Sequence, residues 1–148
     1  YTAGSVENFV FVRTTVPASL AATQAILGAS GSGAARCFVG VDTSGRACAG
    51  VGSNSTTTIV GSTDLRDTEA DIGLTFDGVT VRLIVNGAVE YEAAQSGSPT
   101  TSIPFRLGAN NANGTAGSFY GGSIKRVLAG REYITASRAR QISLALAV

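Results

Sequence analysis

Apolar and polar residues alternate in short runs along most of the chain, and clusters of Gly, Ser, Asn and Thr separate these runs. Alternation with a period of two, bounded by turn residues, is typical of β-strands with one buried face. The polar, threonine-rich residues 52–62 fit either a loop or an exposed edge strand. The pattern predicts strands over residues 9–15, 25–29, 36–41, 47–51, 70–93, 102–109 and 118–133, with an Asn-rich loop over 110–117.

The clearest unit, residues 70–93, has two turn dipeptides, Asp77-Gly78 and Asn86-Gly87, between alternating apolar residues. Both dipeptides favour tight β-hairpins, so a three-stranded meander is expected. A two-residue turn at Asp77-Gly78 pairs Phe76 with Val79 and decides which side chains share a face. The face expected to point inward contains Ile72, Leu74, Phe76, Val79, Val81, Leu83, Val85, Val89 and Tyr91.

The second turn of the meander predicts a β-bulge. A two-residue turn at Asn86-Gly87 would place Glu90 and Glu92 opposite aliphatic residues, which costs several kcal/mol when carboxylates are buried. A bulge at Gly87 shifts the pairing by one residue. We therefore expect Leu83 to pair with Val89 and Arg82 with Glu90.

The two cysteines, Cys37 and Cys48, flank a turn at residues 42–45. If Val41 pairs with Arg46, the two thiols are diagonal neighbours on one face, about 7–8 Å apart. This distance is too long for a disulfide. Both thiols are expected to be free, which fits a protein that folds in a reducing cytoplasm.

Residues from Thr135 onward predict a short C-terminal helix with Thr135 as its N-cap. Arg138 and Arg140 lie unfavourably near the positive end of this helix dipole, so packing against the rest of the protein must stabilise it.

The composition favours one β-rich domain. Of 148 residues, 19 are glycine and only 14% are charged. At this length, folding buries roughly 70% of the unfolded chain's surface, which is enough for a core without outside help. A single domain is expected over residues 1–148. Because the chain starts with Tyr1 and contains no methionine, we expect it to be processed or cut from a longer one.

Two absences restrict the function. The chain has no histidine, the commonest general base and transition-metal ligand, so most enzyme classes are excluded and no cofactor is expected. It has no tryptophan, the best stacking platform for a ligand.

The net charge is +1 and no basic stripe is present, so nucleic acid is not an expected partner. No apolar run approaches the roughly 18 residues of a membrane span.

Two segments carry a family likeness. Residues 76–87 read Phe-Asp-Gly-Val-Thr-Val-Arg-Leu-Ile-Val-Asn-Gly and end in an Asn-Gly turn. Residues 103–109 read Ile-Pro-Phe-Arg-Leu-Gly-Ala and precede an Asn/Gly loop, a Gly-x-Ile step at Ile124 and the helix start. In this order and spacing, the chain resembles the concanavalin A-like lectin and glucanase superfamily, in its laminin-G-like or pentraxin-like branch. The resemblance implies an all-β, two-sheet antiparallel jelly-roll sandwich with a short C-terminal helix.

The resemblance transfers no binding site. Lys125 and Arg126 stand where many relatives have acidic residues, and Gly130 stands where they have an aromatic residue. The superfamily also has many functions on one scaffold, so the function must be argued from this chain's own residues.

One acidic cluster, Asp64, Asp67, Glu69 and Asp71, is a weak calcium candidate. The last three would share one face of a strand. Calcium requires six or more oxygen ligands from several loops, and only this segment is acidic, so a solvated loop is the favoured interpretation. A glycosidase is a remote alternative, because no apolar pocket is evident that would raise one carboxyl pKa.

The Asn-rich loop is a candidate ligand site. Asn110, Asn111 and Asn113 offer amides to sugar hydroxyls, and Tyr120 offers an apolar surface. The competing interpretation is that these residues serve tight turns.

Residues 54–62 and 114–122 are uncharged and are candidates for a protein interface. They contain Ile59, Val60, Phe119 and Tyr120 between Thr, Ser and Gly. Free proteins normally guard such strand edges with charge, so a neighbouring subunit is expected to cover at least one segment.

These observations favour a non-catalytic structural or adhesion module of a phage-like virion, such as a capsid decoration or tail-appendage domain. It would dock on other virion or surface protein subunits in an oligomeric assembly, or attach to a host. Its expected location is the virion surface after assembly in the host cytoplasm, or the extracellular space. The alternative is a lectin-like carbohydrate-binding module, with a glycan as partner.

Overall fold

The structure is a computed structural model that describes residues 7–30, 36–52, 58–94, 104–112, 114–132 and 134–146. It consists of β-strands followed by one C-terminal helix. The elements are β1 (Glu7–Thr15), β2 (Gln24–Ser30), β3 (Arg36–Val41), β4 (Arg46–Gly52), β5 (Thr58–Asp64), β6 (Glu69–Asp77), β7 (Thr80–Val85), β8 (Ala88–Ala94), β9 (Arg106–Leu107), β10 (Asn110–Ala112), β11 (Thr115–Gly117), β12 (Ser123–Gly130) and α1 (Ala136–Leu146).

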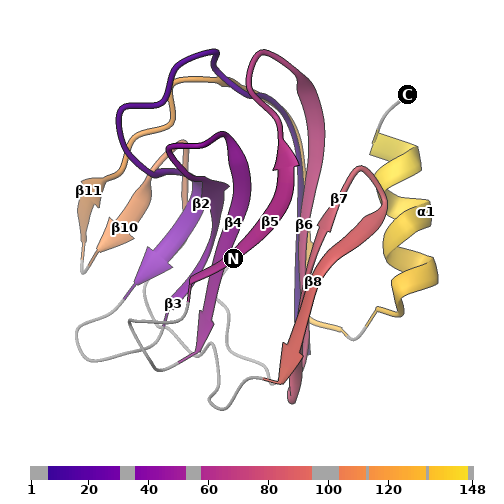
Figure 1. The fold of residues 1–148 in the computed structure, drawn as a ribbon. Helices are drawn as coiled ribbons and strands as arrows, with labels where there is room; N and C mark the ends of the chain where they lie inside the picture. The colour runs from indigo at the N-terminus through magenta and orange to yellow at the C-terminus, as the bar shows by residue number, and fades with distance from the viewer. Residues whose placement is uncertain are drawn as a thin grey trace.

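The strands form two sheets that pack face to face (Figure 1). The five-stranded sheet has the order β12-β1-β6-β7-β8, and the seven-stranded sheet has the order β11-β10-β2-β3-β4-β5, with β9 beside β2. Helix α1 lies on the outer side of the five-stranded sheet, so the layers are helix, sheet and sheet. This is the expected all-β sandwich with a terminal helix. Among the described residues, the strands pair antiparallel except β10 and β2, which run parallel.

Strand β1 shows how the layers are held together. Val10 and Val12 point into the core between the sheets, whereas Phe9 and Phe11 point to the other side. There they pack with Ile84 and with the helix residue Ile142. Both faces of β1 are therefore buried, because a sheet covered on one side by a second sheet and on the other by a helix has no solvent face at its centre.

The C-terminal helix begins as expected. The Thr135 hydroxyl accepts a hydrogen bond from the backbone N–H of Arg138 at 3.2 Å, which confirms Thr135 as the N-cap. Ala139 and Ile142 of α1 are buried against the sheet. Packing therefore stabilises this helix despite its two arginines.

The first hairpin differs from the predicted register. Phe76 pairs with Val81, and Leu74 with Leu83, two residues later than expected. The Asp77 carboxylate accepts hydrogen bonds from the backbone N–H groups of Val79 and Thr80, so the turn extends over four residues. A shift of two residues keeps every paired side chain on its face. Within this hairpin, Val79 leaves the core, and the residue is 66% exposed.

The second hairpin uses the two-residue turn that the sequence disfavoured. Asn86 and Gly87 have φ angles of 49° and 81°, as a type I′ turn requires, and Val85 pairs with Ala88. A β-bulge follows later, because Ile84 pairs with Val89 and Leu83 with Tyr91, leaving Glu90 as the extra residue.

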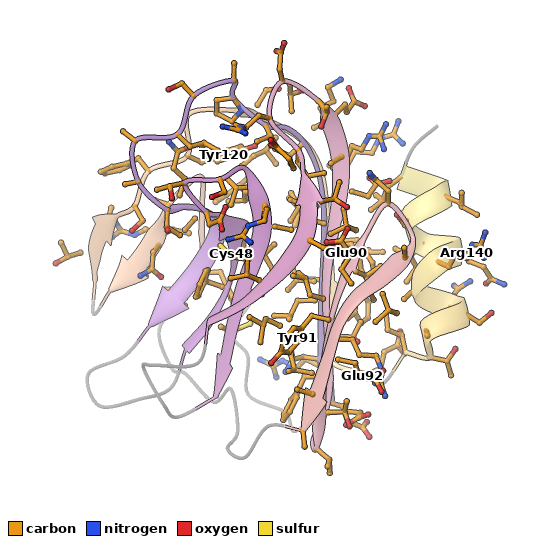
Figure 2. The ribbon with its side chains drawn as sticks, viewed as in Figure 1. Cys48, Glu90, Tyr91, Glu92, Tyr120 and Arg140 are labelled. Carbon is orange, nitrogen blue, oxygen red and sulfur yellow. The ribbon has the colours of Figure 1, made fainter. Side chains whose placement is uncertain are left out.

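This bulge keeps the carboxylates out of the core. Tyr91 points between the sheets and Glu92 points away from them (Figure 2). Arg82 pairs with Glu92 rather than Glu90, and an ion pair of 2.6 Å joins them. Val89, expected inside, is 42% exposed on the outer side. The prediction of a bulge was right, and its position was wrong.

The cysteine hairpin is also shifted by one residue. Val41 pairs with Ala47, so Cys48 pairs with Gly40 and Cys37 with Val51. The two cysteines therefore lie on opposite faces of the sheet. Both are buried and neither forms a disulfide, which confirms the prediction for a different reason than the one expected.

Four segments can be compared with their predictions. Within residues 52–62, Gly52 ends β4 and the described residues 58–62 belong to β5, an edge strand. Within 102–109, only Arg106–Leu107 is described as a strand, and residues 118–133 contain the single strand β12. The expected loop at 110–117 contains the short hairpin of β10 and β11. Among the described residues, no helix is long and apolar enough to cross a membrane.

Candidate ligand-binding face

The outer face of the seven-stranded sheet, turned away from the five-stranded sheet, has one cross-strand row that combines an aromatic ring and an amide. Asn110 of β10 pairs with Gly28 of β2, Gly28 pairs with Phe38 of β3, and Phe38 pairs with Gly50 of β4. Side chains at directly paired positions point to the same face of a sheet. Phe38 therefore stands between two glycines, with Asn110 two strands away.

Gly28 leaves space for the Asn110 side chain, which reaches over it next to the Cβ of Phe38. A Cβ at this position would lie 2.8 Å from Asn110 Oδ1 and 3.1 Å from Phe38 Cβ. Phe38 and Asn110 are both half-buried. The row therefore presents an aromatic side chain and an amide side by side over a glycine.

A second row, Ala25, Gly40, Cys48 and Val60, crosses β2 to β5 on the same face. Its residues are small except for Val60, which is half-buried. Neither row contains a carboxylate. Ala25, Gly40 and Cys48 are buried, so this row offers a ligand little exposed surface.

The asparagines of the Asn-rich loop have different roles. The buried Asn111 side chain donates a hydrogen bond to the Pro104 carbonyl at 2.7 Å and accepts one from the Gly114 N–H at 3.0 Å. It therefore stabilises the β10–β11 turn, as the competing interpretation expected. Asn113 lies outside the described residues. Of the three asparagines, Asn110 is the one placed on the outer face.

Tyr120 also has an internal role. Its hydroxyl accepts a hydrogen bond from Thr14 Oγ1 at 2.7 Å and donates one to the Thr15 carbonyl at 2.8 Å. Its ring packs against the core between the sheets, and burial raises the pKa of the hydroxyl. The structure thus separates Tyr120 from Asn110, with which the sequence grouped it.

The interface candidates do not lie together. Ile59 is only 2% exposed and packs in the core, so its predicted interface role was wrong. The neighbouring Val60 lies on the outer face because adjacent strand residues point to opposite sides. Phe119 is 66% exposed. Whether a protein covers either segment stays a prediction.

The acidic cluster is dispersed. Asp64 pairs with Arg66, which lowers the pKa of that carboxyl to about 2. Asp67 lies in the turn before β6 with a φ of 56°. Glu69 and Asp71 lie on β6 and pair with basic side chains of β1 and β12. In the part of the chain that the structure describes, no group of three acidic or cysteine side chains could hold a metal ion.

Asp71 lies under α1, on the opposite side of the molecule from the outer face of the seven-stranded sheet. Its Oδ2 accepts hydrogen bonds from Arg13 Nη1 at 2.9 Å and from Ser143 Oγ at 3.2 Å. Burial raises the pKa of this carboxyl despite the attraction of Arg13. Asp71 therefore connects the helix to the sheet.

Similar folds occur among solved structures. The CBM40 module of the Ruminococcus gnavus IT-sialidase, bound to alpha2,3 sialyllactose, has a TM-score of 0.78 and 17% identity and covers 95% of this chain and 84% of its own. A SAP-like pentraxin from Limulus polyphemus has a TM-score of 0.69 and 12% identity, covering 96% and 71%. Mouse laminin alpha1 domains LG4-5 have a TM-score of 0.63 and 15% identity, covering 87% and 36%.

No protein-family model matches the chain, and no curated protein matches its sequence. At these identities, the structural similarities show the fold alone. They show the two-sheet jelly-roll sandwich fold that the sequence resemblance implied.

Phe38 is not among the candidate residues that the sequence pattern indicated. A phenylalanine at an alternating strand position is read as core, and Phe38 becomes an outer-face residue only once Val39 is placed inside. The signal available in the sequence was the position of Phe38 directly between Cys37 and Val39, two residues of the inward face.

Proposed function

We propose that this chain is a non-catalytic carbohydrate-binding module that holds a glycan on the outer face of its seven-stranded sheet. The observation that supports the proposal most is the row of Asn110, Gly28 and Phe38. A sugar ring has an apolar C–H face and a rim of hydroxyl groups. An aromatic ring packs on the first, and an amide both donates to and accepts from the second.

The spacing of the row suits a sugar. Neighbouring strands lie about 4.8 Å apart, so Asn110 and Phe38, two strands apart, are separated by about 10 Å at the backbone. The Asn110 side chain reaches over Gly28 toward Phe38, and a Cβ at Gly28 would lie 2.8 Å from Asn110 Oδ1 and 3.1 Å from Phe38 Cβ. A ring resting on Phe38 would lie beside the Asn110 side chain, whose Oδ1 is itself buried over Gly28.

The same face does not offer hydrolytic chemistry. A retaining glycosidase needs two carboxyl groups about 5–5.5 Å apart, one with a raised pKa. The two described rows contain no carboxylate, and the buried Asp71 lies beneath α1 on the other side. Binding without turnover is therefore the function that this face favours.

A glycan array with sialylated and neutral oligosaccharides tests the proposal. We expect the wild-type protein to bind at least one glycan, and Phe38→Ala to weaken that binding at least tenfold. Phe119→Ala is the control, because it removes another phenylalanine ring, which belongs to neither of the two rows. Thermal unfolding checks that both variants fold. Absence of binding to any glycan, or an equal loss in the control, would contradict the proposal.

Docking between protein subunits is the second candidate function. Leu107 and Phe119 are 58% and 66% exposed, and a hydrogen bond of 2.8 Å from Tyr120 N–H to the Gly108 carbonyl holds their segments together. An exposed apolar pair of this kind fits a protein contact. Light scattering of the wild type and of Phe119→Ala tests it. A monomer in both cases excludes self-association through this edge. A virion origin stays a prediction.

A further inference from the structure

Strand β12 forms one edge of the five-stranded sheet. It is eight residues long, and within the described part of the chain β1 is the only strand beside it. Edge strands of this kind are templates for pairing with a further strand. Two large apolar residues of β12, Val127 and Leu128, are 40% and 41% exposed and point to opposite faces of the sheet. The strand therefore offers both backbone and apolar side chains to a partner.

The remaining edges of the sandwich are joined to each other or short. At the side opposite β12, the Glu90 carboxylate of β8 accepts hydrogen bonds from the N–H groups of Ser62 and Thr63 in β5. The edge strand β11 of the seven-stranded sheet has only three residues. Among the described strands, the edge that is both long and apart from this junction is β12.

The two basic residues of β12 are directed back over their own sheet. Lys125 forms an ion pair with Glu69 of β6, so its side chain reaches across β1 and away from the edge. Arg126 donates a hydrogen bond at 3.1 Å to the Leu146 carbonyl of α1, the helix that covers this sheet. Outward-pointing charges normally guard an edge strand against pairing. These two contacts draw the charges inward and leave the edge of β12 open to another strand.

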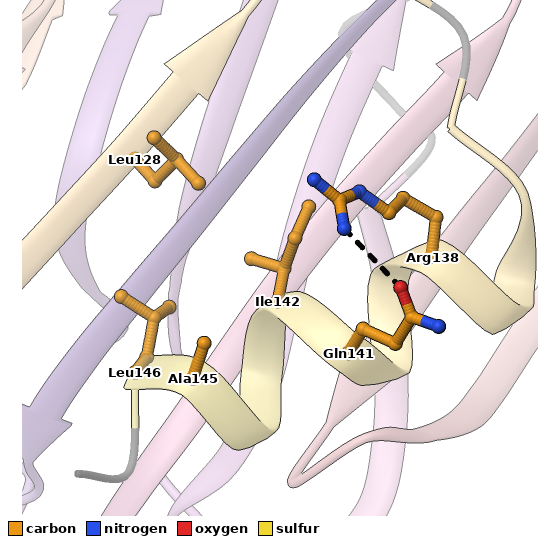
Figure 3. A pocket seen from close by; sticks show the side chains of 6 residues that line it. All are labelled: Leu128, Arg138, Gln141, Ile142, Ala145 and Leu146. Carbon is orange, nitrogen blue, oxygen red and sulfur yellow. Dashed lines mark hydrogen bonds between the residues drawn. The ribbon is translucent and has the colours of Figure 1, made fainter.

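The helix leaves room beside this edge. It packs over Phe11 and Ile84 of the inner strands β1 and β7, and a shallow groove of about 230 Å³ lies between it and Leu128. Figure 3 shows Leu128 on β12 across this groove from Ile142 and Leu146 on α1. A strand added beside β12 would therefore continue the sheet without displacing the helix.

We propose that β12 pairs antiparallel with β12 of a second copy of this chain, with Val127 at the two-fold axis between them. The five-stranded sheets of the two copies then form one continuous sheet. A second copy suits this edge because β12 has two unlike halves: Lys125 and Arg126 precede Val127, and the uncharged residues 128–130 follow it. Antiparallel pairing lays the basic half of each strand beside the uncharged half of the other. The contact is independent of the proposed glycan face.

The charges of β12 select this register. With Val127 at the axis, Arg126 faces the partner's Leu128 and Lys125 faces the partner's Ala129, so no like charges are directly opposite. The aliphatic stem of Arg126 can then pack on the partner's Leu128. With Leu128 at the axis, Lys125 would instead face the partner's Arg131. Because a two-fold pairing covers both edges at once, the assembly ends at two copies.

Cysteine cross-linking of the full chain tests the register. Paired residues at the axis have Cα atoms about 4.5–5.5 Å apart, which a disulfide can bridge. Under mild oxidation, Val127→Cys should form a linked dimer at least tenfold faster than Ser123→Cys. Ser123 is exposed on the same strand, but its two copies would lie about 27 Å apart. Equal rates for the two variants would show random collision and overturn the proposal.

Sedimentation equilibrium tests the association itself. We expect the wild type to form a dimer, and Val127→Lys to weaken it at least tenfold, because two lysines would meet at the axis. Val79→Lys is the matched control: it places the same charge at an exposed valine of the β6–β7 turn and should leave the dimer unchanged. Thermal unfolding checks that both variants fold.

Three results would overturn the proposal. The first is a wild type that stays monomeric at every concentration measured. The second is an equal loss of the dimer in Val127→Lys and Val79→Lys. The third is a dimer that Phe119→Ala dissociates and Val127→Lys does not, since the copies would then meet through the edge that contains Phe119.

Discussion

Glu90 of β8 binds the backbone of Ser62 in β5, where Glu90 Oε2 accepts a hydrogen bond from the Ser62 N–H at 2.7 Å. The two strands belong to different sheets, so this contact joins the edges of the sandwich. The Thr63 N–H and hydroxyl bind the same carboxylate. Both strands are irregular here: Glu90 is the extra residue of one bulge, and the β4–β5 register shifts next to residues 62 and 63.

Glu90→Ala should therefore destabilise the protein. Hydrogen bonds to a charged group contribute about 1–3 kcal/mol, and we expect a loss near the middle of this range because Glu90 is half-buried. Urea unfolding measures the change. Glu92→Ala is the control on the same strand: its exposed ion pair with Arg82 should contribute about 0.5 kcal/mol or less. Equal losses would contradict the joining role of Glu90.

Asp71 makes stability depend on pH. Burial raises its folded pKa, so its contribution to the free energy of unfolding is fully present below the ordinary aspartate pKa and decreases as the pH rises through the raised value. The groups that face it are Arg13, Glu69 and Ser143, and Lys125 neutralises Glu69.

Asp71→Asn removes this titration and leaves the rest of the charges in place. The stability of the variant relative to the wild type should therefore rise between about pH 3 and about pH 7. Urea unfolding at both pH values measures this difference. A fall over the same range would mean that the attraction of Arg13 outweighs the cost of burial.

The thiols should be unreactive in the folded protein. Burial raises the pKa of Cys37 to about 12, and Cys48 is fully buried. Reaction with a thiol reagent should detect no groups in the native state and both after unfolding without reductant. Detection of neither after unfolding would indicate a disulfide and contradict the opposite-face placement of the two residues.

Gly73 permits the packing under α1. A Cβ at this position would lie 2.2 Å from a ring carbon of Phe11. Gly73→Ala should therefore cost about 1–3 kcal/mol, because Phe11 is fully buried and cannot move freely. Gly117→Ala is the control, since nothing lies within 4 Å of its added Cβ. In thermal unfolding, Gly73→Ala should therefore melt at a clearly lower temperature than Gly117→Ala.

Two substitutions at the start of α1 should have opposite effects on the stability of the protein. Thr135→Ala removes the N-cap and should cost about 1 kcal/mol. Arg138→Glu places a negative charge in the first helical turn and should raise stability by about 0.5 kcal/mol. Chemical unfolding measures both changes. If Arg138→Glu lowers stability, then its contact with Gln141 matters more than the helix dipole.

The sequence alone determined most of the strands, the terminal helix and its cap. These features depend on local alternation, on Asp-Gly and Asn-Gly turns and on a threonine before a helical segment, and local chemistry decides each of them. It also determined that Ile72, Leu74 and Leu83 are core, because a shift of two residues leaves the face unchanged.

The tertiary structure decided what depends on contacts between distant residues. The bulge forms at Glu90 rather than at Gly87. In this position the Glu90 carboxylate accepts a hydrogen bond from the Ser62 N–H of the other sheet, and the local sequence does not show this contact. The strand register decides which face of the sheet each side chain occupies. It places Phe38 on the outer face, as a candidate ligand residue, and Ile59 in the core. Asn110 and Phe38 are far apart in the chain, and only the parallel pairing of β10 with β2 brings them together over Gly28.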